Sequence, residues 1–240
     1  MATETKYPPR VVRGRTELWV PHNGREIAFA PLIRGNYRNI GAQILANNQR
    51  VPTGDYTASL VDSAYFAPEV ANELEFKAVR DAVRGCWLWV FNIDTWTDKG
   101  VYSMHDLEAK GLSDTTSIKQ LEAMLKGGKE LSWGGIRISQ DGRVGFAPEG
   151  SYKLGEHTAE SLATDGLVVV TYNVDGAKKI GKLSTKFRDN PKTRGIKVQK
   201  GQTPEKRVSA LGDYCLGGGL IVLGPHFGAY GDGHASGVWK

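Results

Sequence analysis

Four side chains that could bind a metal ion lie close together in the sequence: Asp94, Asp98, His105 and Asp106. Carboxylates and imidazoles commonly bind divalent cations. The surrounding stretch DTWTDKGVY, however, has the composition of a hairpin loop, where acidic residues occur because they suit turns. We therefore expect neither a metal site nor a bound cofactor.

The chain contains two cysteines, Cys86 and Cys215. Two cysteines are too few for a disulfide framework or a zinc site. Each begins an apolar segment, CWLWVF or CLGGGLIV, so we expect buried thiols, with one structural disulfide as the alternative. A catalytic cysteine would need a nearby base, and the sequence identifies none.

Other common catalytic motifs are missing. Ser132, Ser139 and Ser209 lie outside any G-x-S-x-G pattern. The stretch GGGLIVLG has no GK[ST] sequence and begins a strand instead of a helix, so it does not match a phosphate-binding loop. No pair of carboxylates has a spacing that indicates acid–base catalysis. The sequence therefore favours a protein that is not an enzyme.

The composition is that of a folded domain, with 240 residues, 40% of them hydrophobic and 24% charged. No apolar run approaches the roughly 20 residues of a membrane helix, so we expect no membrane insertion. The first residues, MATETKYPPR, lack a secretory signal. The chain could still reach the outside of a cell as part of a particle.

The net charge is +5, and the densest basic stretch is GAKKIGKLSTKFRDNPKTRGIK, residues 176–197. A solvated face is the simpler interpretation, and a phosphate-binding strip is the alternative. Phe187 is its only aromatic residue, which leaves little for base stacking. We expect no nucleic-acid partner.

The first part of the chain has helical patterns. We expect a strand hairpin that turns at Asn23-Gly24, then a helix capped by Asn36 and a second that starts at Thr53 or Asp55. A third helix is predicted over 68–85, because Pro68 suits a first helical turn and Gly85 a stop. Further helices are predicted over 114–128, opened by Asp114, and over 157–166.

The later part is rich in short strands. CWLWVF alternates bulky side chains on both faces, so we expect a strand buried on both sides. A hairpin is predicted with Asp141-Gly142 as its turn. Further strands are expected at LVVVTYNV (167–174), RGIKVQ (194–199), RVSALG (207–212), LIVLG (220–224) and HASGVWK (234–240).

Helices early and antiparallel strands late indicate an α+β fold rather than βαβ alternation. No repeat, low-complexity tract or linker interrupts the chain. We therefore expect one domain over 1–240, with N-terminal strands in 1–35.

The C-terminal segment has an unusual composition. Between Ser209 and Val238 there is no Lys, Glu, Gln, Met or Trp, although roughly five or six would be expected at the chain's own usage. None of these five residue types can be reached from the asparagine codons AAC or AAT by changing only the two adenines. The segment is either a glycine-rich loop that lacks these residues by chance or a product of adenine-directed codon randomisation.

With these residues the chain resembles the variable proteins of diversity-generating retroelements, which are viral tropism determinants and microbial surface proteins with a C-type lectin fold. The match lies chiefly in RVSALGDYCLGGGLIVLGPHFGAYGDGHASGVWK, in which RVSAL, LIV and ASGV look like fixed framework. The early stretch NNQRVPTGDYTASLV also resembles a helix junction of such domains. The ligand-binding positions would be Asp213, Tyr214, Gly217, Gly218, Gly219, Gly224, Pro225, His226, Phe227, Gly228, Ala229, Tyr230, Gly231, Asp232 and His234. Gly212 would be a further varied position.

The resemblance implies helices packed on small antiparallel sheets with long irregular loops, and a variable ligand-binding region over 208–240. It also implies display on a virion or outside a cell after a cytoplasmic stage, and a protein or glycan ligand on a host or neighbouring cell. A homo-oligomer is possible on this basis. The sequence lacks EPN, QPD and WND motifs, so the calcium-dependent sugar site of true C-type lectins has no support, and the two-cysteine active site of formylglycine-generating enzymes is missing.

Tyr214, His226, Phe227, Tyr230 and His234 would be the anchors of the binding surface, because aromatic residues give contact area at low entropic cost. The rival interpretation is an enzyme or cofactor-binding domain that uses the glycine-rich tail as a substrate loop.

Overall fold

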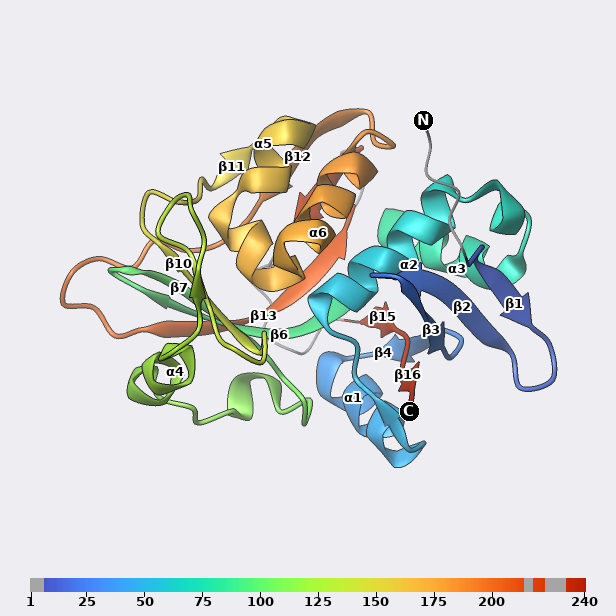
Figure 1. Cartoon of the computed structure of the whole chain (residues 1–240), viewed down its shortest axis with the longest axis horizontal. Helices are drawn as coiled ribbons and strands as arrows, with labels where there is room; N and C mark the ends of the chain where they lie inside the picture. Colours follow the sequence, from blue (N-terminus) through green and yellow to red (C-terminus); the bar gives the residue numbers. More distant parts are fainter. Residues whose placement is uncertain (1–6, 214–217, 223–231) are drawn as a thin grey trace.

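The computed structural model describes residues 7–213, 218–222 and 232–240. Their helices and strands form two sheets with helices packed between and around them, and α2 crosses the middle of the molecule beside α6 (Figure 1). None of the helices in these ranges has the length and apolar character needed to cross a membrane. The architecture confirms the predicted α+β class.

The smaller sheet joins the two ends of the chain. Its strands run in the order β1-β2-β3-β16-β5, and Val238 of β16 pairs with Phe29 of β3. The end of the chain therefore lies beside the N-terminal strands. The predicted turn at Asn23-Gly24 is also confirmed, since both residues have positive φ angles of 47° and 77°. The bounds are β1 Arg10–Val12, β2 Glu17–His22, β3 Arg25–Phe29, β5 Gln49–Arg50 and β16 Val238–Trp239.

The larger sheet is built around the long strand β6, which pairs with β7 on one side and β13 on the other. Its order is β11-β12-β14-β13-β6-β7-β10-β9-β8, and β15 pairs with both β6 and β4. Most neighbours are antiparallel, but β12 with β14 and β15 with β6 are parallel. The bounds are β4 Ile33–Gly35, β6 Leu88–Thr97, β7 Gly100–His105, β8 Lys129–Glu130, β9 Arg137–Ile138, β10 Val144–Pro148, β11 Gly155–Glu156, β12 Asp189–Thr193, β13 Glu205–Gly212, β14 Gly219–Val222 and β15 Gly233–Ala235.

Strand β6 is buried on both faces, as its sequence predicted. Trp87, just before it, and Trp89 are 7% and 1% exposed. Trp89 packs with Phe91 against helix α1 on one face, whereas Leu88 and Val90 belong to the core with α2, α3 and α6 on the other. The strand is therefore the central layer of the fold.

Helix starts follow their capping residues. Asn36 and Thr53 cap α1 and α2 as predicted, because their side chains accept backbone N–H groups of the first helical turn. The fourth helix begins after Ser117 rather than at Asp114, since Ser117 and Gln120 form a capping box there. The bounds are α1 Tyr37–Ala46, α2 Gly54–Phe66, α3 Leu74–Gly85, α4 Ile118–Leu125, α5 Ala159–Thr164 and α6 Gly166–Ser184, with 3-10 turns η1 Pro68–Val70 and η2 Gly111–Ser113.

The prediction of a strand at LVVVTYNV is wrong, because residues 167–174 lie in α6. Asp165 caps this helix by accepting the N–H groups of Leu167 at 3.0 Å and Val168 at 3.4 Å. The helix breaks at Asn173, which has φ 63° and ψ 169°. The idea that helices lie early and strands late is therefore also wrong.

Three other boundaries differ from prediction. The strand expected at 194–199 lies at 189–193, where it pairs with β14. The region 68–85 is not one helix, since the chain turns between η1 and α3. The last segment forms two short strands, β15 and β16, because Ser236 and Gly237 leave the larger sheet to reach the smaller one.

Candidate ligand-binding region

The end of β13 is attached to the end of α3. The backbone N–H of Asp213 donates to the carbonyl of Val83 at 2.6 Å. Oδ1 of Asp213 is buried with no partner among the residues that the structure covers. Burial raises the pKa of this carboxyl, and the charge of Asp189 raises it further. Asp213, a predicted site residue, is therefore half-buried rather than freely solvated.

Gly218, which directly precedes β14, is attached to the start of β12. Its carbonyl accepts the backbone N–H groups of Arg188 at 2.9 Å and Asp189 at 3.1 Å. Gly218 has φ +73°, a conformation that strains any residue with a side chain. A Cβ at Gly219 would lie 3.1 Å from the carbonyl of Asn190. Both predicted site glycines therefore have backbone roles, and variation at Gly218 would carry a conformational cost.

The segment that leads into β15 is attached to the start of β6. The thiol of Cys86 donates to the carbonyl of Asp232 at 3.0 Å. The backbone N–H of His234 donates to the carbonyl of Trp87 at 2.7 Å. Asp213 and Asp232 therefore flank one place, the α3–β6 junction formed by residues 83–89. Nothing in the sequence marked this junction as the anchor.

The side chains of Asp232 and His234 differ in environment. Asp232 is exposed and lies 3.4 Å from the guanidinium of Arg34, which is also exposed. His234 is half-buried, and its Nδ1 has no partner among the described residues. Burial, with a smaller effect of Arg34, lowers the pKa of His234, so its imidazole is neutral at pH 7. Such a ring offers a ligand both apolar surface and an unused nitrogen.

The framework around these positions is buried. Leu220 and Val222 are 0% exposed, Val238 is 1% and Ile221 is 6%, which confirms that they point inward. Gly212 also belongs to this framework, because a Cβ there would lie 2.3 Å from the carbonyl of Cys86. The expectation that Gly212 varies is therefore wrong.

The structure describes five of the predicted ligand-binding positions: Asp213, Gly218, Gly219, Asp232 and His234. The remaining ones lie outside the described residues, and their role stays a prediction. They are Tyr214, Gly217, Gly224, Pro225, His226, Phe227, Gly228, Ala229, Tyr230 and Gly231.

The four candidate metal ligands each have a different structural role. Oδ2 of Asp94 accepts the Ser209 hydroxyl at 2.6 Å inside the core. His105 contacts the carbonyl of Phe91 through Nδ1 at 3.0 Å. Asp106 accepts backbone N–H groups at the start of η2, and Asp98 lies in the β6–β7 turn. Within the described ranges no three potential ligands come together.

Of the two cysteines, Cys86 is a half-buried free thiol, and Cys215 lies outside the described residues. The glycine-rich tail forms β14 and β15 where it is described. Nothing in the described part supports the alternative of an enzyme that uses this tail as a substrate loop.

Comparison with known proteins gives one informative likeness. No family of known sequences and no curated protein matches the chain. A solved nanoarchaeal structure is similar to this chain, with a TM-score of 0.55 and 14% sequence identity. It is described as the accommodation of massive sequence variation in Nanoarchaeota by the C-type lectin fold. The likeness covers 86% of this chain and 96% of the nanoarchaeal one. Together with the two sheets and the packing described above, it identifies the fold of this chain as a C-type lectin fold.

Proposed function

We propose that this chain is a non-enzymatic ligand-binding protein and that residues 208–240 form its variable binding region. The observation that carries the proposal is the contrast between buried framework residues and an exposed predicted site residue in this region. Leu220, Val222 and Val238 are buried in the core, whereas Asp232 is exposed and lies, like Asp213, beside the α3–β6 junction. Surface positions next to a buried framework can change sequence without changing the core.

The composition of the region supports the same function. Tyr, His, Gly and Asp suit a binding surface, whereas Lys and Glu are depleted in interface centres. The missing residue types are those that changes at the adenines of asparagine codons cannot produce. We therefore propose a variable protein of a diversity-generating retroelement, displayed on a virion or outside a cell, with a protein or glycan ligand on a host or neighbouring cell.

A library experiment tests the proposal. Two libraries are displayed on yeast, one with NNY codons at the predicted ligand-binding positions other than Gly218, the other with NNY codons at an equal number of buried framework positions. We expect most members of the first library to fold, as judged by resistance to protease, and to yield binders to unrelated proteins. We expect most members of the second to be degraded. Equal degradation of both libraries would contradict the proposal.

The genomic locus gives a second test. We expect a reverse transcriptase gene nearby, together with a near-copy of the sequence for 208–240 that differs from it at adenines. A locus with neither the reverse transcriptase gene nor the near-copy would contradict the assignment to a retroelement. The library experiment would then still test ligand binding.

A further inference from the structure

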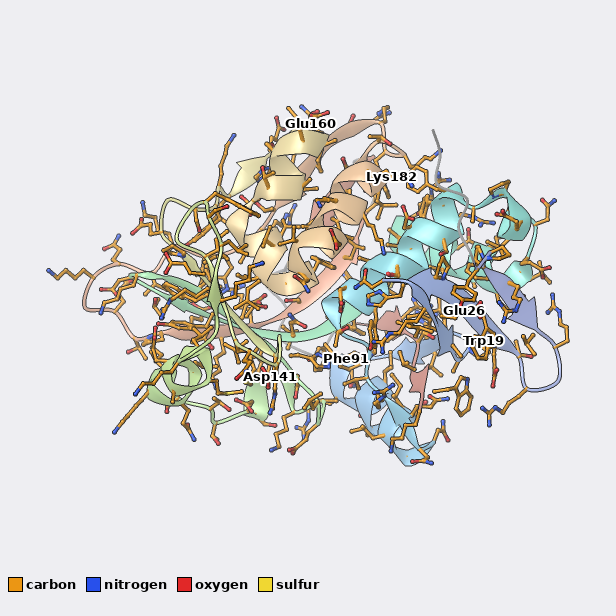
Figure 2. All side chains as sticks on the ribbon, in the orientation of Figure 1. Trp19, Glu26, Phe91, Asp141, Glu160 and Lys182 are labelled. Carbon is orange, nitrogen blue, oxygen red and sulfur yellow. The ribbon has the colours of Figure 1, made fainter. Side chains whose placement is uncertain are left out.

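A cavity of about 460 Å³ lies on a part of the molecule separate from the variable region. It is enclosed by the first turn of α2, the break in α6, the turn between β2 and β3, and the tip of the β9–β10 hairpin. Asp141, labelled in Figure 2, marks that tip. None of its described lining residues lies between 208 and 240. Its volume falls within the roughly 300–1,000 Å³ of small-molecule sites.

Three arginines line this cavity: Arg25, Arg50 and Arg143. Arg25 donates to the hydroxyl of Tyr56 at 2.7 Å, and Nε of Arg143 donates to the carbonyl of His105 at 3.4 Å. In the described part of the chain none of the three forms an ion pair with a carboxylate. A guanidinium presents several N–H donors in a fork that matches carboxylate and phosphate oxygens.

The carboxylates at the cavity are already engaged by other groups. Asp55 lies 3.4 Å from Nε2 of His22. Burial alone would raise the pKa of Asp55, but hydrogen bonds from His22 and Thr53 lower it. Asp141 accepts the Ser139 hydroxyl at 2.6 Å and the backbone N–H of Arg143 at 3.0 Å, which fixes the hairpin turn. The arginine side chains are thus the groups left to bind a ligand.

The wall of the cavity contains a strained residue and an unpaired polar atom. Asn173, at the break in α6, has φ 63° and ψ 169°, a region that is nearly restricted to glycine. Asn92 faces α6 from β6, and its Nδ2 donates to the carbonyl of Thr171 at 3.3 Å. Its Oδ1 has no partner within residues 7–213, 218–222 and 232–240, although the residue is only 4% exposed. Buried unpaired acceptors are uncommon in folded proteins and need a structural reason.

We propose that this cavity is a second binding site, which takes a small organic ligand carrying an oxyanion, either a carboxylate or a phosphate. The arginines bind the oxyanion at the mouth of the cavity. The unpaired Oδ1 of Asn92 supplies an acceptor at its base for an N–H or O–H group of the same molecule, reached by a small adjustment of the cavity wall. The site is independent of the variable region, so its ligand stays the same when residues 208–240 change.

Thermal unfolding with simple anions tests the proposal, because a free anion can occupy the oxyanion subsite by itself. The full chain is titrated with sodium phosphate and with sodium succinate, and sodium chloride at matched ionic strength serves as the reference. A ligand that binds only the native state raises Tm progressively, because it stabilises that state by RT ln(1 + [L]/Kd). We expect at least one of the two anions to raise Tm above the chloride reference with this logarithmic dependence on concentration, and which one does so distinguishes phosphate from carboxylate. A Tm that follows the chloride reference with both anions would overturn the proposal.

Substitutions then locate the site. We expect Arg50→Gln and Arg143→Gln each to weaken binding of the anion that raises Tm by about tenfold or more, since each removes a charge-assisted contact. Arg143→Lys should restore only part of the loss, because lysine has no fork. Arg38→Gln is the matched control, since Arg38 is an exposed arginine on α1 outside the cavity. Equal weakening by Arg38→Gln would show diffuse attraction to positive charge and would overturn the site.

Discussion

Gly233 lies so close to Trp89 that a Cβ at position 233 would fall 2.6 Å from the indole Nε1. Gly233 begins β15, the short strand that places the end of the variable region against β6. The buried indole of Trp89 donates in turn to the carbonyl of Gly35, at 3.2 Å. A glycine is therefore required at this position by packing, even though it lies between two predicted ligand-binding residues, Asp232 and His234.

The first prediction follows from this contact. Gly233→Ala should lower the free energy of unfolding by about 1–3 kcal/mol, because the added methyl group must displace Trp89 or the backbone of Trp87. Asp232→Ala is the control, since its exposed side chain should cost within about 0.5 kcal/mol. Urea denaturation of both variants measures the difference. Equal stability of the two would show that β15 does not pack as described.

The second prediction separates the framework from the binding surface. Val222→Ala should cost about 1–3 kcal/mol, because this side chain is 0% exposed and its loss leaves a cavity. Substitution of His226, Tyr230 and Asp232 together by Ser should leave Tm nearly unchanged and abolish binding of the ligand, since aromatic anchors carry much of the energy of an interface.

Gly218 is left out of this triple variant, because its φ of +73° penalises any side chain whatever the exposure. Unfolding of the triple variant, with Val222→Ala unaffected, would place the varied segment in the core and contradict the proposed function.

Sequence patterns predicted the parts of the fold that local chemistry determines. The turn at Asn23-Gly24 and the caps Asn36 and Thr53 were found because each is specified by one or two residues. The strand that contains Trp89 was found because both of its faces carry bulky residues. These are effects of immediate neighbours, which a sequence displays directly.

The sequence pattern gave a wrong prediction at α6, where tertiary packing determines the secondary structure. LVVVTYNV is rich in β-branched residues and has no helical period, because residues 167–172 are buried on all sides. Gly54 and Gly145 permit this burial, since Cβ atoms there would lie 1.9 Å from the Thr171 carbonyl and 2.6 Å from Cβ of Val170. Such close approaches between distant segments leave no local signal.

The sequence predicted the buried framework of the candidate site, but not the contacts that attach the site to the α3–β6 junction. Composition marked the segment that is predicted to vary, and Leu220 and Val222 are buried, as expected of the framework that the resemblance implied. The role of Cys86 and Trp87 as anchors could not be read from the sequence, because every residue has a backbone carbonyl and a thiol does not reveal which carbonyl it contacts.

The third prediction concerns the break in α6. Asn173→Ala should lower stability by about 1–2 kcal/mol, because the Asn173 side chain accepts the backbone N–H of Val174 at 2.8 Å and alanine keeps the strained φ while losing this cap. Asn173→Gly loses the cap but relieves the strain, so it should be close to neutral. The glycine variant would thus be more stable than the alanine variant at position 173, which reverses the usual order of these residues inside a helix. Denaturation showing alanine as the better residue would contradict the strained conformation.

The last prediction is a pH dependence that arises from Asp94. This side chain is 0% exposed, and burial raises its pKa from 3.8 to about 6, although hydrogen bonds from Ser209 and Ser103 oppose the shift. Between these two values the folded protein keeps a proton that the unfolded chain has lost. The contribution of Asp94 to stability is therefore most favourable below about pH 4, declines as the pH rises to about 6, and then stays constant.

Replacing Asp94 by asparagine, which is neutral at every pH, isolates this effect. The variant should gain up to about 3 kcal/mol relative to the wild type at pH 8, because two pKa units correspond to roughly that energy, and the gain should shrink to near zero at pH 4. Urea denaturation of both proteins from pH 4 to pH 8 measures the difference, so other titrating groups cancel. Asp98→Asn, in the β6–β7 turn, is the matched control for replacing a carboxylate by an amide. A constant difference for Asp94→Asn over the whole range would mean that the buried carboxyl does not titrate as its environment implies.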